Sequence, residues 1–182
     1  AGHTVRPFFR EQIPQDQTGP AQIELEAISQ VVDQTAVTED LYTAVGRGSS
    51  NNPGGVLSID QNTGAGTLVG DPITPGGLTG LDFDSSGRLW GSSIDGPRGN
   101  RTSEIVEIDP DSGALLSSTP ITVGGTSISI GDLAVQPGTD IIFGVHSNAD
   151  ATTIPGGLIY TINPTTGAAT LVGNTFQGRN GG

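Results

Sequence analysis

Short apolar runs rich in Val, Ile and Leu alternate along the chain with clusters of Gly, Pro, Asp, Asn, Ser and Thr. The pattern is clearest in residues 55–70, which read GVLSIDQNTGAGTLVG. A strand-like run leads to Asp60, a short turn ends at Gly64, and a second strand-like run follows. Apolar runs separated by turn residues in this way predict a β-hairpin.

The same hairpin recurs in residues 104–116 and 157–173. Its turn glycine falls at Gly64, Gly113 and Gly167, a period of about 50 residues, which is typical of repeat architectures. Glycine suits the end of such a turn because it adopts positive φ freely.

A second hairpin precedes each of these. It is clearest in residues 78–93 and recurs in residues 130–146. In the first copy, residues 41–46 match its second strand, and residues 23–32 are expected to supply its first. The sequence therefore predicts an all-β chain of three units, each with four antiparallel strands joined up and down, and no long helical stripe interrupts this pattern.

The repeat, with its blocks LTGLDFD, SGRLWG, SIDQNTG and TLVG, resembles the β-propeller blades of bacterial secreted and surface proteins, near the NHL and YVTN types. The resemblance implies three propeller-type blades in an incomplete ring, because closed propellers have about four to eight. We expect an N-terminal arm over residues 1–20, blades over 21–75 and 76–125, and a third blade with a tail over 126–182.

Three such sheets would leave two apolar outer faces in water, which favours self-association. Two chains could share one six-bladed ring, chains could stack into an open polymer, or the chain could be a fragment of a longer propeller. The arm carries Val5, Phe8 and Phe9 outside the repeat. We hypothesise that these residues contact a neighbouring subunit or add a strand to another sheet edge; alternatively they cover the chain's own first blade.

Composition narrows the classes of partner. The net charge is −12, all seven basic residues are scattered arginines, and there is no Cys or Met among the 182 residues. Charge-driven binding to nucleic acid or an anionic membrane is therefore not expected. No long apolar stretch predicts a membrane span. The chain begins with Ala1, which favours loss of a signal peptide and an extracellular or cell-surface location.

Catalytic and metal-binding signals are sparse. The two histidines, His3 and His146, belong to no known catalytic motif, so no catalytic residue and no cofactor is predicted. The spacings Asp82-x-Asp84-x-x-Gly87 and Asp109-x-Asp111-x-Gly113 are similar to the start of calcium loops. Both are placed on hairpin turns, where Asp caps the backbone, so the turn interpretation is favoured and calcium is the alternative.

Polar loops offer one further surface. Residues 46–55, 92–103 and 147–157 are predicted to lie together on one side of the sheets, which suits a polar or carbohydrate partner. Trp90 occupies a strand position that Tyr42 and Phe143 share, which favours a structural aromatic over a sugar-stacking platform.

These observations lead to one functional hypothesis. The chain is a non-enzymatic extracellular or surface module that self-associates into a multimer or filament. The alternatives are a fragment of a propeller enzyme of the lactonase or glycosidase type, and a carbohydrate-binding propeller. The first would need acids or His repeated at equivalent strand positions, and the second would need aromatics repeated in the loops.

Overall fold

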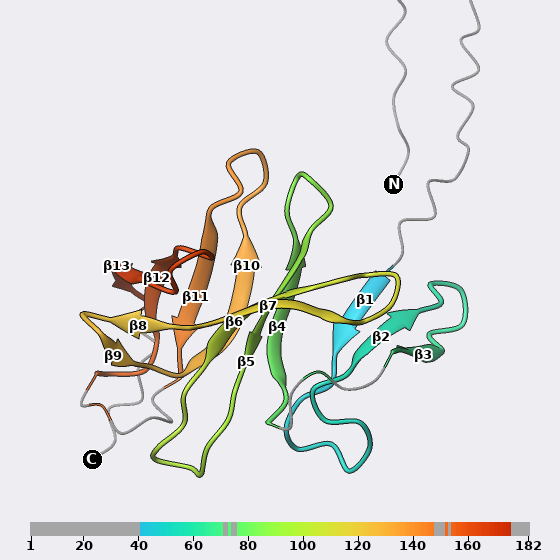
Figure 1. Ribbon diagram of the computed structural model, residues 1–182, viewed down its shortest axis with the longest axis horizontal. Helices are drawn as coiled ribbons and strands as arrows, with labels where there is room; N and C mark the ends of the chain where they lie inside the picture. Colours follow the sequence, from blue (N-terminus) through green and yellow to red (C-terminus); the bar gives the residue numbers. More distant parts are fainter. Residues whose placement is uncertain (1–40, 71–72, 74–75, 148–151, 153, 176–182) are drawn as a thin grey trace, which may run out of the picture. The chain divides into compact units, whose positions relative to one another are not determined.

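The computed structural model describes residues 41–70, 73, 76–147, 152 and 154–175. By its internal contacts the chain divides into two units, Ala1–Val37 and Thr38–Gly182, and the described residues all belong to the second. They form thirteen strands in four antiparallel sheets, which are labelled in Figure 1. The all-β class predicted from the sequence is therefore confirmed.

The middle sheet has four strands that neighbour one another in chain order (Figure 1). The turn between its last two strands ends at Gly113, whose φ is 69°. Other residues avoid this angle, so glycine permits the tight reversal here. The strands are β4 (Leu78–Phe83), β5 (Leu89–Ser93), β6 (Glu104–Ile108) and β7 (Leu115–Pro120).

The last sheet repeats this up-and-down arrangement, again with its strands in chain order. Its final turn ends at Gly167, whose φ is 68°. The four-stranded unit expected from the repeat is thus confirmed in two of three copies. The strands of the last sheet are β10 (Ile130–Val135), β11 (Ile142–His146), β12 (Leu158–Ile162) and β13 (Ala169–Asn174).

The first sheet shows three strands among the described residues, in the order β1-β2-β3. These strands are β1 (Leu41–Ala44), β2 (Val56–Ile59) and β3 (Gly66–Val69). The fourth strand expected from residues 23–32 lies outside the described residues. The three larger sheets are open, and the described strands do not close into a ring.

A small two-stranded sheet links the middle and last sheets. It consists of β8 (Thr122–Val123) and β9 (Thr126–Ser127), which the repeat pattern does not predict. Gly124 and Gly125 form its turn with φ values of 57° and 83°. Two successive positive φ values match the Gly-Gly hairpin turn, so this dipeptide between Thr-Val and Thr-Ser was the available sequence signal.

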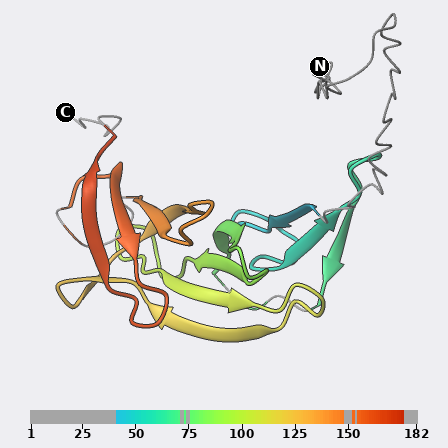
Figure 2. The ribbon, with the colours of Figure 1, turned by 90° about the horizontal axis from the view of Figure 1, so that it is seen from above.

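The middle sheet buries a different face against each neighbour, as Figure 2 shows from above. On one face, Trp90 and Ile105 join a core with side chains of the last sheet. On the other, Leu89 and Ile108 join a core that includes Val56 of the first sheet. Successive strand residues point to opposite faces, so neighbours in sequence enter different cores.

Burial of these side chains supplies the main stabilisation of the unit, at roughly 1.5–3 kcal/mol for each large apolar side chain. The prediction of a sheet that is apolar on both faces is thus confirmed for the middle sheet.

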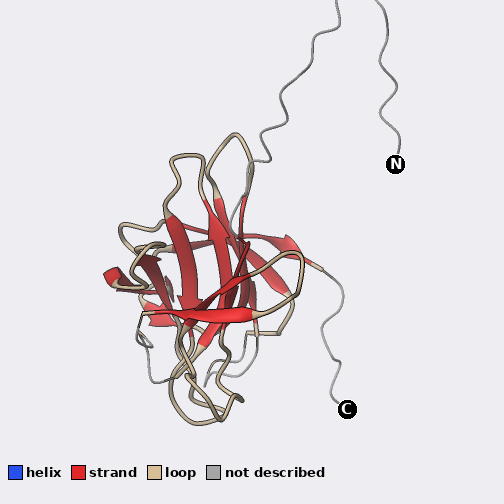
Figure 3. Ribbon diagram, turned by 90° about the vertical axis from the view of Figure 1, so that its right-hand side faces the viewer, coloured by secondary structure: helices blue, strands red, loops and turns tan. Residues whose placement is uncertain are grey.

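Only strands, turns and loops appear among the described residues (Figure 3). Within that part of the chain there is accordingly no helix with the length and apolar character needed to cross a membrane.

Candidate functional site

The seam between the middle and last sheets is the most elaborate polar feature of the described unit. Strands β4 and β10 are the edge strands of their sheets, and they lie against each other. Thr79 Oγ1 donates a hydrogen bond to the Ile130 carbonyl at 2.9 Å, and the Val135 N–H donates to Asp82 Oδ2 at 2.7 Å. Side chains of β4 therefore satisfy backbone groups of β10, in place of a continuous ladder of backbone hydrogen bonds.

Close backbone approach makes this seam possible. A Cβ atom added to Gly80 would lie 2.3 Å from the backbone nitrogen of Leu133, a distance that real Cβ atoms do not reach. Gly80 therefore allows β4 and β10 to meet. Thr79 and Gly80 belong to the LTGL block of the second unit, but the sequence alone assigned them no role.

A second contact joins the hairpin tips of the same two sheets. The Ser85 N–H donates to Asp140 Oδ1 at 2.8 Å, and the Ser85 hydroxyl donates to Asp140 Oδ2. Asp140 has a φ of 55°, which is uncommon for a residue other than glycine but is tolerated by Asp. Sequence analysis missed this pair, because nothing in the local pattern shows that the two turns meet.

The Asp84 carboxylate accepts four hydrogen bonds. Its Oδ1 accepts the N–H groups of Ser86 at 2.9 Å and Arg88 at 3.0 Å, while its Oδ2 accepts Arg88 Nε at 2.7 Å and Trp90 Nε1 at 3.0 Å. Burial acts to raise the pKa of Asp84, but the bonds from Trp90, Arg88 and Ser86 together outweigh it and hold the pKa below that of an ordinary aspartate.

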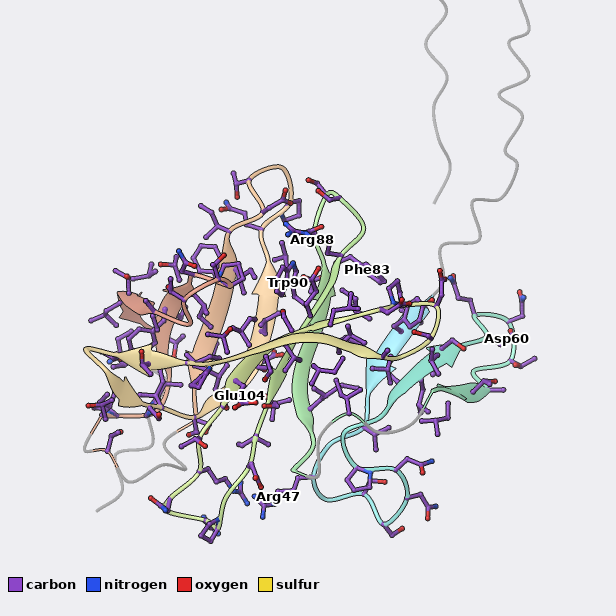
Figure 4. All side chains as sticks on the ribbon, in the orientation of Figure 1. Arg47, Asp60, Phe83, Arg88, Trp90 and Glu104 are labelled. Atoms are coloured by element: carbon purple, nitrogen blue, oxygen red, sulfur yellow. The ribbon has the colours of Figure 1, made fainter. Side chains whose placement is uncertain are left out.

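The guanidinium of Arg88 also covers the ring of Trp90 at 5.2 Å, and Figure 4 shows the two side chains near each other. Trp90 is only 4% exposed and belongs to the core between the sheets. Its interpretation as a structural aromatic is confirmed.

The two calcium-like spacings have separate outcomes. The turn interpretation is confirmed for Asp84, and for Asp109, whose Oδ1 accepts the N–H groups of Asp111 at 2.9 Å and Ser112 at 3.0 Å. It is wrong for Asp82, which lies within strand β4 and reaches the neighbouring sheet. Spacing alone does not show where a strand ends.

Three of these carboxylates, Asp82, Asp84 and Asp140, line a shallow cleft of about 270 Å³. Each accepts hydrogen bonds from the protein. In the part of the chain that the structure describes, no three His, Asp or Glu side chains are grouped so that they could hold a metal ion.

The turns that end in a glycine form a second kind of seam. A Cβ atom on Gly113 would lie 1.9 Å from the Val69 carbonyl oxygen, so the β6–β7 turn lies directly against the end of β3 (Figure 2). A Cβ atom on Gly167 would lie 2.0 Å from the Pro120 carbonyl oxygen at the end of β7. The Thr122 N–H also donates to the Gly167 carbonyl at 2.9 Å. The first and middle sheets thus each receive a turn from the sheet that follows in the chain.

A groove of about 290 Å³ lies at the edge of the first sheet. Tyr42 and Ala44 of β1 form one wall, and Leu78 and Leu81 of β4 form another. Within the described residues, β1 has one ladder partner, β2. The groove therefore lies between β1 and β4, two strands whose residues contact each other.

The remaining predicted site residues are placed as follows. His146 is 1% exposed, and its Nδ1 lies 3.1 Å from the Pro155 carbonyl, as expected for a histidine that belongs to the core. His3 and the predicted oligomer contacts Val5, Phe8 and Phe9 lie outside the described residues.

Two of the three predicted loops come together. The Arg47 guanidinium, labelled in Figure 4, donates to the carbonyl of Gly96, which joins residues 46–55 to residues 92–103. Residues 147–157 are only partly described.

The chain matches no known protein family, and a search of curated proteins finds no significant relative.

Proposed function

We propose that the chain is a non-enzymatic extracellular or cell-surface module, built from propeller-type blades, that self-associates into a multimer or filament. The observation that carries this proposal is the open arrangement of the three larger sheets, which do not close into a ring among the described residues. The seams between the sheets supply a structural role for Thr79, Asp82, Trp90 and Asp140.

Both ends of the array support association. At the first sheet, the groove beside β1 is lined by Tyr42 and Leu78, and Leu41 is 51% exposed. At the last sheet, Leu171 and Val172 on β13 are 56% and 57% exposed. Apolar side chains of this size are exposed at a cost in water, and a partner that covers them gains roughly 25 cal/mol for each Å² buried.

The N-terminal arm is the proposed occupant of the groove beside β1. An extended segment that carries Val5, Phe8 and Phe9 can add a strand to a sheet edge of a neighbouring subunit. In an assembly, the arm of one chain occupies the groove of the next.

The decisive measurement is the absolute mass of the full chain by light scattering over a range of concentrations. We expect multiples of 18.4 kDa, with a dimer if two chains share a ring and a growing distribution if they form a filament. A mass of 18.4 kDa at every concentration would contradict self-association.

A variant that lacks residues 1–20 tests the arm separately. Loss of the multimer in this variant supports arm exchange. An unchanged mass would show that the arm packs on its own chain and that the sheets mediate association.

A further inference from the structure

The loop that follows β5 contains the one Asp-Gly sequence of the chain, Asp95-Gly96. Asp95 is exposed, and Gly96 is partly covered. The Gly96 N–H donates to Oδ1 of Asp95 at 2.7 Å, and among the described residues no backbone carbonyl accepts it. The amide nitrogen of Gly96 therefore lies directly beside the carboxyl group of the residue before it.

The surrounding loop holds this contact in place. The Asp95 N–H donates to the Thr102 carbonyl at 3.0 Å, and the Thr102 N–H donates to the Asp95 carbonyl at 3.1 Å. The Arg47 guanidinium donates to the Gly96 carbonyl from the neighbouring loop. The bond from Thr102 polarises the peptide group between Asp95 and Gly96, which makes its nitrogen easier to deprotonate.

Two other aspartates make the same contact but lie within strands. The Phe83 N–H donates to Asp82 Oδ1 at 2.9 Å, and the Leu133 N–H donates to Asp132 Oδ1 at 2.8 Å. Both are followed by a large side chain, and both are paired with a neighbouring strand, so a reaction there would have to pull the backbone out of its ladder. Asp95 is followed by glycine in a loop, where neither obstacle is present.

We infer that Asp95-Gly96 is a site of spontaneous covalent modification, at which Asp95 converts to isoaspartate through a cyclic imide. The Gly96 nitrogen bonds to Cγ of Asp95. The C–O bond of the protonated carboxyl group breaks with its electron pair on oxygen, and the hydroxyl leaves with the amide hydrogen as water. A water molecule then opens the ring at either carbonyl and gives aspartate or isoaspartate.

The reaction needs no enzyme, oxidant or cofactor, because both reacting groups belong to adjacent residues. Groups that are held next to each other in this way react much faster than groups that must first find the right geometry. The inference concerns the loops at this end of the sheets and does not depend on self-association.

The modified chain should lose the contact between the two loops. In isoaspartate the main chain runs through Cβ and Cγ, and the former main-chain carbonyl of residue 95 becomes a carboxylate. The bond from Thr102 and the bond from Arg47 to the Gly96 carbonyl both depend on the original backbone path. We expect the modified chain to melt at a temperature about 2–4 °C lower than the unmodified chain.

Peptide mapping of the full chain after prolonged incubation at neutral pH tests the site. Isoaspartate leaves the peptide mass unchanged, but it alters the retention time and the electron-transfer fragments. We expect isoaspartate at Asp95 in about tenfold or greater excess over Asp82 and Asp132, which serve as internal controls. Equal amounts at the three positions, or none at Asp95, would overturn the inference.

Two variants test the chemistry at the same position. Asp95→Glu is the matched control, because it keeps the charge but lengthens the side chain, so the corresponding larger ring closes far more slowly. We expect no modified product at this position in Asp95→Glu. Asp95→Asn can form the same imide with loss of ammonia in place of water and should give isoaspartate sooner than the parent. If Asp95→Asn gives none, the loop prevents ring closure and the inference is wrong.

The melting temperature tests the effect on the loops. It should fall during incubation of the parent in proportion to the isoaspartate formed, and it should stay constant in Asp95→Glu. An equal fall in both chains would show that the change arises elsewhere and would overturn the predicted loss of the loop contact.

Discussion

The first and middle sheets carry the same repeat but differ sharply in burial. Ile59 and Ile108 both stand one residue before the Asp that opens the turn. Ile108 is fully buried, whereas Ile59 is only partly covered. The middle sheet is covered on two faces by neighbours, and the first sheet has one described neighbour. Burial of a repeat position therefore depends on the adjoining sheet more than on the residue itself.

The aromatic position shows the same difference. Trp90 is buried between the middle and last sheets, while Tyr42, at the matching position of the first sheet, is half-buried and meets Phe83 edge-on at 5.5 Å. The matching aromatic side chains of the first and middle sheets therefore differ in burial. This difference can be tested by matched substitutions.

The largest contrast is expected for the two isoleucines. Ile108→Ala should lower the free energy of unfolding by about 3–4 kcal/mol, because it leaves a cavity in a fully buried site. Ile59→Ala should cost about 1 kcal/mol, since that site is already partly open to water. Equilibrium denaturation with urea measures both. Similar losses in the two variants would show that the first sheet is covered as fully as the middle one.

A smaller effect is expected at Asp84, a feature of the middle sheet alone. Asp84→Asn replaces one accepting oxygen with an NH2 group that cannot accept a hydrogen bond. Either the bonds from Arg88 Nε and Trp90 Nε1 or the two backbone bonds are lost, so we expect a loss of about 2–3 kcal/mol at neutral pH. Asp111→Asn, at an exposed turn residue, is the control and should leave the denaturation midpoint nearly unchanged.

Acid should remove the Asp84 contribution. Because the pKa of Asp84 is lower in the folded chain than in the unfolded one, its stabilisation is complete above about pH 4 and disappears as the pH falls through the folded value. The pKa values of Asp60 and Asp109 are lowered in the same direction by the backbone N–H groups of their turns. The difference in free energy of unfolding between the parent and Asp84→Asn should therefore decrease below about pH 4. A constant difference would show that it comes from packing.

The smallest effect is expected at the inner seam. Thr79→Val removes the bond to the Ile130 carbonyl, which keeps a longer contact of 3.4 Å from Ser103 Oγ, so we expect a loss of about 1 kcal/mol. Thr161→Val, whose hydroxyl makes only a 3.5 Å contact within its own sheet, is the control. Equal losses in the two variants would remove the special role of the seam.

The strands could be predicted from the sequence because each repeat contains its own turn residues. The positive φ of Gly64, Gly113 and Gly167 was expected from their place in the repeat, and it is confirmed. The same reasoning misplaced Asp82 in a turn and assigned no partner to Asp140. Their partners, Val135 and Ser85, lie more than 50 residues away in the chain.

The amino-acid sequence by itself determined the strands, the glycine turns and the two-faced apolar sheets, because these follow from interactions between residues close together in the chain. Only the tertiary structure decided how deeply each repeat is buried, which carboxylates join neighbouring sheets and where the turns at Gly113 and Gly167 meet the next sheet. Those outcomes depend on distant backbone segments that approach to within a few ångströms, and no local pattern records such distances.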